Sequence, residues 1–287
     1  MKKKVISSEF KHSKNSSRRK DHWLPQGFLR GFISPSRLAK NRPLWHYSIL
    51  TKQWTEKSPK KIGYDYGFYD YALGTDAATA ANPDMVFARL EREYSLIRAE
   101  LIKCHFAKWG KHKEFFLEYI QMISVRSPLA LVQHETQSRQ FRGTTITKVH
   151  PDGKTLTVNS LKLKPLSENA IRNVTLTKVL SEAQQIPPWM KQLDWCLRYT
   201  DNENNPFCVN DQALYLIGTE KQPQVSTDLI NHPDSILVFP LCWQACLFGS
   251  SLKFDNPYDQ AHPTQLISLR NDLKLNATKF IIAPNKY

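Results

Sequence analysis

Apolar residues recur every three or four positions through the first half of the chain, which is the spacing of one helix face. This pattern predicts a helix over 83–104. The segment 112–125 is apolar on almost every side, so we expect a second helix there, in the centre of the fold. Helical spacing resumes after Pro128 to about residue 142, and it returns over 167–185.

Shorter apolar runs separated by polar turns follow toward the C-terminus, which is typical of strands. These runs lie at 195–199, 206–209, 213–217, 235–239 and 245–248. A last helix is expected at about 264–275, before the apolar end of the chain at 279–283. A helix-rich middle followed by a strand-rich end predicts an α+β fold, in which the helical N-terminal and middle part packs with a mostly antiparallel sheet from the C-terminal part.

Two hairpins and one short helix complete the pattern. Alternation over 44–49 and 52–55 predicts the first hairpin. A Pro-Asp-Gly turn in the segment 144–164 predicts the second, as an excursion from the helical core. The short helix covers 25–32. We therefore expect a single domain over 21–287, preceded by a flexible basic arm over 1–20.

Aromatic residues gather directly before the first long helix, at Tyr64, Tyr66, Phe68, Tyr69 and Tyr71. Such a cluster serves either as a surface on which bases stack or as a packing seam between elements. Packing is the favoured interpretation.

The composition excludes several classes of protein. The chain has 287 residues, of which 41% are hydrophobic and 23% charged, and both values are ordinary for globular domains. The most apolar stretch, 235–252, is interrupted by Pro240, Trp243 and Gln244, and the N-terminus lacks the apolar centre of a signal peptide. We expect a cytoplasmic protein that does not enter a membrane.

Five scattered cysteines agree with a reducing compartment. Cys242 and Cys246 have a C-x3-C spacing, but no second pair of ligands lies near them in the sequence. We interpret them as small buried apolar residues and predict no metal site. The sequence leaves any cofactor unassigned.

The positive charge is concentrated in the first fifth of the chain. Residues 1–61 hold 16 lysines and arginines against three acids, or +13 of the total of +14. A flexible basic arm gains affinity for phosphate backbones because it releases counterions. The predicted nucleic-acid-binding residues are Lys11, Lys14, Arg18, Arg19, Lys20, Arg37, Lys40 and Arg42. The expected partner is RNA or DNA; a protein encoded in the same operon and a merely solubilising tail are the alternatives.

Common catalytic signatures are absent from the sequence. It contains no G-x-x-x-x-G-K-[ST] phosphate loop, no G-x-G-x-x-G, no H-E-x-x-H and no G-x-S-x-G. What remains is a set of polar residues within apolar segments, where burial requires a partner or a purpose. These candidate catalytic residues are His22, Arg30, Glu91, Arg126 and Asp211, with Gln26 beside them.

Two interpretations of these residues stay open. In one, they converge in a cleft and act on a phosphodiester, where His22 moves protons while Arg30 or Arg126 stabilises phosphate charge. In the other, they form a structural network in which Glu91 or Asp211 pairs with Arg126. Sequence spacing does not choose between the two.

The opening segment His22-x-x-Pro25-Gln26-x-x-Leu29-Arg30-x-Phe32 resembles the bacterial domain-of-unknown-function family 4238. Further pieces follow in the order typical of this family, namely Trp45-His46-Tyr47, Phe68-Tyr69, Glu91, Arg126-Ser127-Pro128, Phe207-Cys208-Val209-Asn210-Asp211 and Phe239-Pro240-Leu241. The resemblance spans about residues 21–285. It implies a shared fold, whereas the family's name assigns no activity.

Two hypotheses for the function follow. The first is a nucleic-acid-directed effector, nuclease-like, that works in phage defence or in a toxin-like system, with the candidate residues as its site. The second is a non-catalytic module that binds nucleic acid or protein, in which the same buried polar residues are structural.

Overall fold

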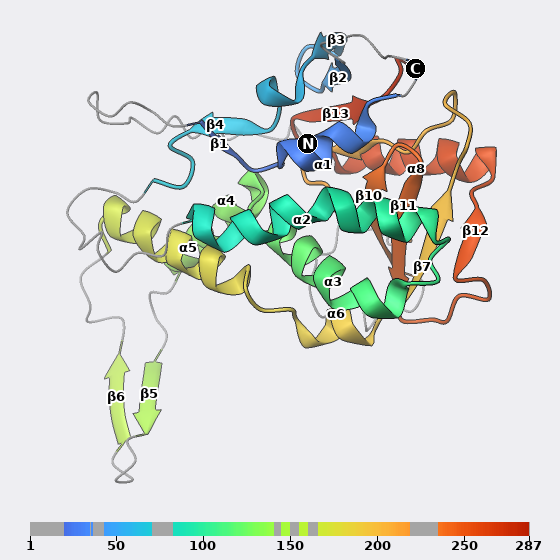
Figure 1. Ribbon diagram of the computed structural model, residues 1–287. Coiled ribbons are helices and arrows are strands. Elements are labelled where there is room, and N and C mark those ends of the chain that lie inside the picture. Colours follow the sequence, from blue (N-terminus) through green and yellow to red (C-terminus); the bar gives the residue numbers. More distant parts are fainter. Residues whose placement is uncertain are drawn as a thin grey trace.

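The computed structural model describes residues 20–34, 36, 43–70, 83–140, 145–149, 155–159, 166–218 and 235–286 (Figure 1). Most of the predicted basic arm, Tyr71 and the Pro-Asp-Gly turn lie outside these residues. The described part combines helices with mostly antiparallel sheets, which confirms the predicted α+β class.

The long helices form where the apolar spacing predicts them. They are α2 (Pro83–Lys103), α3 (Trp109–Val125), α4 (Pro128–Gln140), α5 (Glu168–Glu182) and α8 (Pro263–Asn276). Helix α3 begins three residues earlier than predicted, because the ring of Trp109 packs on those of Phe106 and Trp195 at 5.0 and 5.9 Å. This start is hidden in the sequence, since Gly110 and Lys111 interrupt the apolar pattern.

Shorter helical pieces connect the long elements. They are α1 (Gln26–Leu29), which continues as the 3-10 turn η1 (Arg30–Phe32), then η2 (Pro59–Lys61), and α6 (Pro188–Gln192). Within the described residues, no single helix has the length and apolar character of a membrane span, and only the bent pair of α3 and α4, which meet at 66°, passes that test together.

A five-stranded sheet forms the centre of the molecule (Figure 1). Its order is β12 (Tyr258–Gln260), β7 (Asp194–Tyr199), β11 (Ala245–Ser250), β10 (Ile236–Cys242) and β9 (Tyr215–Ile217). Neighbouring strands are antiparallel except for β12 and β7, which are parallel.

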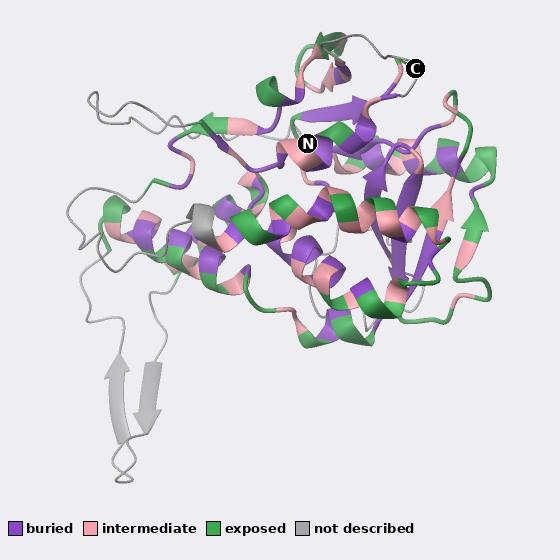
Figure 2. Cartoon of the chain, in the orientation of Figure 1, coloured by how far each residue is buried: buried purple, intermediate pink, exposed green. Residues whose placement is uncertain are grey.

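The inner strands β10 and β11 of the central sheet are buried on both faces (Figure 2). Successive side chains of a strand point to opposite faces, so Leu237 and Phe239 join the core beneath α1, α2 and α3, whereas Val238 joins the core beneath α8. The continuous apolar runs seen in the sequence are thus explained by a three-layer arrangement with helices on each side.

A second, four-stranded sheet joins the two ends of the chain. Its order is β3 (Gln53–Lys57), β2 (Leu44–Ser48), β13 (Phe280–Ala283) and β8 (Val209–Asn210). The predicted N-terminal hairpin therefore pairs with the C-terminal strand β13. The bounds predicted for a strand at 206–209 were wrong, since β8 covers only Val209–Asn210. Phe207 donates its N–H to the Trp243 carbonyl and not to a neighbouring strand of this sheet.

Two small ribbons lie outside these sheets. Strand β1 (Lys20–His22) pairs with β4 (Tyr64–Tyr66), and β5 (Thr145–Val149) pairs with β6 (Thr155–Asn159). The second ribbon confirms the predicted hairpin. The first was not predicted, since three residues are too few to show alternation.

The first helix is held against the central sheet by close aromatic and backbone packing. The Phe28 ring stacks on Phe239 at 5.7 Å, and Tyr94 donates its hydroxyl hydrogen to the Leu241 carbonyl at 2.9 Å. A Cβ atom at Gly31 would lie 3.1 Å from the Cβ of Cys242. Glycine at this position lets η1 approach β10, where the Gly31 carbonyl accepts the N–H of Trp243.

The corner between α2 and α3 is stabilised by one carboxylate. Glu100 accepts hydrogen bonds from Lys108 at 2.6 Å and contacts His112 at 3.0 Å, and Lys111 lies 3.5 Å away. The hydrogen bond from Lys108 is the main reason that the pKa of Glu100 falls from 4.5 to about 2. The carboxylate therefore joins the end of one helix to the start of the next.

We predict that this corner contributes stability that is lost in acid. The folded pKa is depressed, so the contribution is complete above the ordinary pKa of 4.5 and disappears as the pH falls toward 2. The melting temperature of Glu100→Gln should lie below that of the wild type at pH 6, and the difference should shrink as the pH approaches 2. Glu114→Gln, which changes an exposed glutamate on α3, is the matched control. A difference that stays constant with pH would contradict this role.

Candidate functional site

The buried side chain of Arg126 brings four segments of the chain together. It lies at the break between α3 and α4 and is only 4% exposed. Its Nε donates to the Tyr69 hydroxyl at 3.0 Å, one Nη donates to Glu91 at 2.6 Å, and the other donates to the His22 carbonyl. From its position at the end of α3, the guanidinium thus contacts β1, the segment after β4, and α2.

The surroundings of Arg126 keep it charged. Burial by itself would lower the pKa of Arg126, but the neighbouring Tyr69 and Glu91 outweigh burial and raise the pKa above its ordinary value. The guanidinium also lies over the Phe87 ring at 4.2 Å. A buried cation with these partners is satisfied by the protein itself, which is the expected arrangement for a structural charge.

The segment Phe68–Tyr69 is fastened at its backbone as well. Asp21 accepts the N–H of Tyr69 at 3.1 Å, and Arg172 donates to the carbonyl of Phe68. Arg172 in turn lies 3.6 Å from Glu135, which is buried between α4 and α5. We call the set Asp21, Tyr69, Glu91, Arg126 and Arg172 the arginine latch.

His22 adjoins the latch but takes part through its backbone. Its ring lies 5.5 Å from that of Tyr64, and its Nε2 is buried without a hydrogen-bond partner among the described residues. Burial lowers the pKa of His22 below 6.5, against the opposing effects of the Lys60 backbone and the Glu91 carboxylate. The imidazole is therefore neutral at pH 7 and keeps one free nitrogen.

Glu91 is the member of the latch that faces solvent. About a third of its side chain is exposed, at 35%, in contrast to Arg126 beside it. One carboxylate oxygen binds Arg126, as the structural interpretation of the sequence expected. His22, Glu91 and Arg126 are thus brought together in one place.

The other candidate residues lie on other elements of the fold. Arg30 is exposed in η1, and Gln26 is half-buried at the start of α1. Asp211 is buried, and its carboxylate accepts the N–H groups of Thr278 and Lys279 at 2.9 and 3.1 Å as well as the Thr278 hydroxyl. Asp211 therefore fixes the entry into β13 and does not pair with Arg126.

Of the predicted basic residues, Lys20 is described, and Lys11, Lys14, Arg18, Arg19, Arg37, Lys40 and Arg42 lie outside the described residues. The ammonium of Lys20 lies over the rings of Tyr64 and Tyr66, at 4.7 and 5.6 Å from their centres. Each of these rings is at least partly exposed. The aromatic run therefore divides, with Tyr69 in the core and Tyr64 and Tyr66 at the surface.

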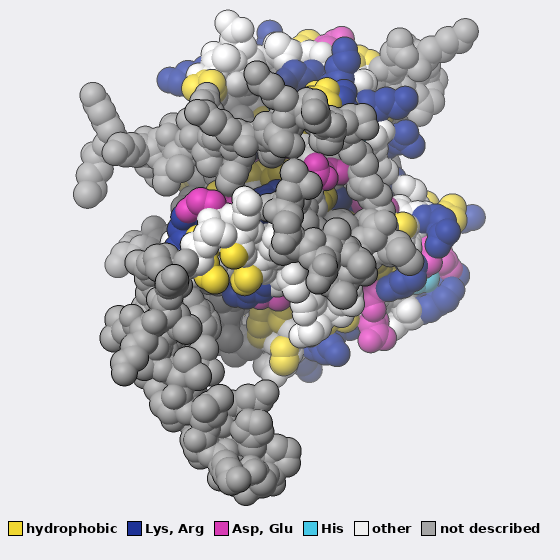
Figure 3. All heavy atoms as spheres, turned by 90° about the vertical axis from the view of Figure 1, so that its left-hand side faces the viewer, with side chains coloured by type: hydrophobic (Ala, Val, Ile, Leu, Met, Phe, Trp, Pro, Cys, Tyr) yellow, Lys and Arg dark blue, Asp and Glu magenta, His cyan; other side chains and the backbone are white. Residues whose placement is uncertain are grey.

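Three further lysines directly precede β4 in the sequence. They are Lys57 at the end of β3 and the exposed Lys60 and Lys61 in η2. We call Lys20, Lys57, Lys60, Lys61, Tyr64 and Tyr66 the basic ribbon. Figure 3 shows lysine and arginine side chains gathered at the upper end of the molecule, at the height of the β2–β3 hairpin. Nearby Glu56 and Asp65 offset part of this charge.

Sequence reasoning missed two parts of this region. Tyr69 appeared in the aromatic cluster and in the Phe68-Tyr69 piece of the family resemblance without a role of its own, and Asp21 was not a candidate, although it directly precedes His22. The lysines of η2 were counted in the charge of the first 61 residues without being assigned to a surface. Among the described residues, no three His, Cys, Asp or Glu side chains are grouped to hold a metal ion.

The fold and the site define an α+β protein with a buried arginine latch beneath a basic, aromatic surface. The chain belongs to the family described as protein of unknown function (DUF4238), whose sequence model matches residues 20–286. This match confirms the resemblance seen in the sequence. No curated protein and no solved structure matches the chain.

We predict that the latch is required for stability. Arg126→Met removes the hydrogen bonds to Tyr69, Glu91 and the His22 carbonyl, and it should lower the free energy of unfolding by about 2–4 kcal/mol. Urea denaturation followed by circular dichroism measures this decrease. The matched control is Arg89→Met, since Arg89 pairs with Glu118 on the surface and its removal should cost about 0.5 kcal/mol or less. Equal decreases in the two variants would contradict the latch.

Proposed function

We propose that the protein binds nucleic acid through the basic ribbon together with the basic segment that precedes it. The observation that carries this proposal is the position of Lys20 over Tyr64 and Tyr66. Residues 1–19 add seven lysines and arginines against one glutamate directly before this point in the sequence. Positive charge and exposed rings therefore occur together.

The two kinds of side chain have complementary roles toward a single strand. Lysines neutralise phosphates and release counterions, whereas aromatic rings stack with bases of any sequence. This arrangement supports binding that is strong at low salt and tolerant of sequence. The arginine latch supports it indirectly, because Arg126 holds the His22 carbonyl at one end of β1 while Lys20 lies at the other.

The salt dependence of binding tests this proposal. Fluorescence anisotropy with a labelled single-stranded RNA and its DNA counterpart should show that affinity falls steeply as salt rises. In the double variant Lys60→Ala/Lys61→Ala, the slope of log K against log salt should decrease by up to about 1.4, or about 0.7 for each phosphate that is no longer neutralised. Deletion of residues 1–19 should decrease it further.

The matched control changes two exposed lysines on other elements, Lys103→Ala/Lys253→Ala, and should leave the slope unchanged. Absence of binding to either oligonucleotide at low salt would overturn the proposed function. If the salt slope decreased equally in both double variants, binding would depend on net charge in general and not on the basic ribbon.

A second candidate function is hydrolysis of the bound strand, with the unpartnered Nε2 of His22 as the candidate base; this nitrogen is buried, so the reaction requires that the site open when the strand binds. A neutral imidazole can accept a proton from an attacking water or hydroxyl group. Arg126 is occupied by its own partners, so phosphate charge would instead be met by Lys20 and Lys60. Use of such an activity in phage defence or in a toxin-like system stays a prediction of the sequence.

Cleavage assays with purified protein separate the two candidates. If His22 acts as a base, RNA or DNA should be cut in the presence or absence of divalent metal. The rate should fall in acid as the imidazole becomes protonated, and because burial lowers the pKa of His22, this fall should lie at a lower pH than for an ordinary histidine. His22→Gln should reduce the rate by about 100-fold or more while the melting temperature and the affinity for the strand stay close to those of the wild type. Intact oligonucleotides after incubation with wild-type protein would leave binding without catalysis.

A further inference from the structure

A polar hollow lies at the start of α8, next to β12 and on the opposite side of the molecule from β1 and β4 (Figure 1). Its volume is about 260 Å³, and its polar lining consists of Thr200, Asp201, Asn202, Asn205, Gln260 and His262. The rim residues Asp201, Asn202 and Gln260 are exposed, whereas Thr200, Ala261 and Leu266 are buried at its base. The hollow therefore combines an open rim with a closed floor.

The polar groups of the rim are held in place but retain free hydrogen-bonding capacity. One oxygen of Asp201 accepts from the Gln260 amide at 3.1 Å. The side-chain oxygen Oδ1 of Asn202 accepts the backbone N–H of Asn204 at 2.9 Å. Within the described residues, the second oxygen of Asp201 and the amide nitrogen of Asn202 make no hydrogen bond. A carboxylate acceptor and an amide donor thus remain for a ligand.

The rim begins where two paired strands are joined by ring stacking and a backbone hydrogen bond. The rings of Tyr199 and Tyr258 stack at 4.7 Å, which joins β7 to β12 directly before Thr200 and Gln260. The N–H of Ala261 donates to the Tyr199 carbonyl at 2.8 Å. Gln260 lies on β12 itself, whereas Asp201, Asn202 and Asn205 lie in the loop that follows β7, so these contacts fix the start of that loop and lower the entropic cost of ordering it around a ligand.

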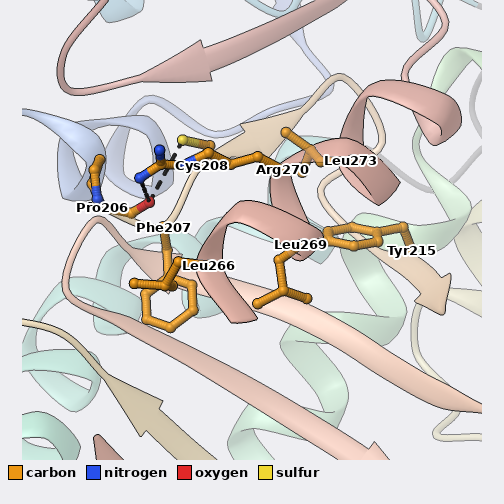
Figure 4. A pocket seen from close by; sticks show the side chains of 8 residues that line it. All are labelled: Pro206, Phe207, Cys208, Tyr215, Leu266, Leu269, Arg270 and Leu273. Carbon is orange, nitrogen blue, oxygen red and sulfur yellow. Dashed lines mark hydrogen bonds between the residues drawn. The ribbon is translucent and has the colours of Figure 1, made fainter. Parts of the chain in front are cut away.

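The wall of the hollow continues into the apolar packing beneath α8 (Figure 4). Leu266 lines both spaces, and the second space has a volume of only about 10 Å³. Arg270 reaches from α8 to the carbonyl of Pro206 at 3.4 Å and to the Asn205 side chain at 3.5 Å. Arg270 thereby positions Asn205 at the edge of the hollow.

The charge of the lining disfavours an anionic ligand. Among the described residues, neither a lysine nor an arginine lines the hollow, and Asp201 contributes a negative charge. The start of α8 does not compensate, because Pro263 has no N–H and the His262 side chain already accepts the N–H of Thr264. A phosphate or carboxylate would therefore meet repulsion and few donors.

We infer that this hollow binds a neutral sugar through neighbouring hydroxyl groups. A pair of hydroxyls can donate to the Asp201 carboxylate and accept from the amides of Asn202 and Asn205, which matches the groups that are present. The volume suits a single sugar ring, since it lies just below the range of about 300–1,000 Å³ that is common for larger ligands. The sugar is either a free monosaccharide unit or the ribose of a nucleoside. This inference is independent of the proposed function, because the basic ribbon does not line the hollow.

Isothermal titration calorimetry on the full chain tests the inference with four probes: the methyl glycosides of ribose, glucose and galactose, and adenosine. At least one should bind, and Asp201→Ala should weaken it by about tenfold or more because a charged hydrogen-bond acceptor is removed. Binding of a methyl glycoside identifies a sugar site. Binding of adenosine alone, abolished when its 2′-hydroxyl is removed, identifies a ribose site of a nucleoside.

The matched control is Asp255→Ala, which removes an exposed aspartate that does not line the hollow and should leave the affinity unchanged. Gln260→Ala is a second test on the rim and should also weaken binding, while its circular dichroism spectrum matches that of the wild type. The inference is overturned if none of the four probes binds at about 10 mM, the weak end of specific affinity, or if Asp201→Ala and Asp255→Ala bind equally well.

Discussion

The burial of one guanidinium, that of Arg126, is the constraint on which the N-terminal half of the fold depends. A charge removed from water must be matched by partners in the protein, and Arg126 finds them on elements far apart in the sequence. Its partners His22, Tyr69 and Glu91 belong to a short strand, an irregular segment and a long helix. Apolar packing of Trp23, Tyr69 and Phe87 also joins these elements, and Arg126 adds directional hydrogen bonds between them.

The latch also explains how two weak elements persist. Strand β1 has three residues and, in the part of the chain that the structure describes, pairs only with the equally short β4; an isolated ribbon of that size is marginal in water. The His22 carbonyl at the end of β1 accepts from Arg126, and Asp21 beside it accepts from the backbone of Tyr69. The ribbon is thus stabilised by the core beneath it more than by its own ladder.

The local sequence pattern predicted which helices and strands form, but not which of them pair with one another. Helices such as α2 and α3 are evident from their apolar spacing, and so are the runs of the central sheet. The pairing of β2 with β13 joins residues more than two hundred positions apart, and no local signal specifies it. The same limit applies to the site. Arg126 and Glu91 could be recognised as polar residues within apolar segments, whereas Asp211 looked similar in the sequence and instead fastens the start of β13.

Among the described residues, Lys20 and Lys60 are held in position next to the arginine latch. A cation in water is attracted to any polyanion, but a surface with defined geometry requires that its lysines and rings keep fixed relative positions. Arg126 fixes His22, β1 fixes Lys20 next to Tyr64 and Tyr66, and η2 holds Lys60 where its backbone meets the His22 ring. An ion pair in the interior therefore sets the geometry of charges on the outside. The buried polar residues and the basic surface, which looked like competing explanations in the sequence, are therefore physically connected through β1.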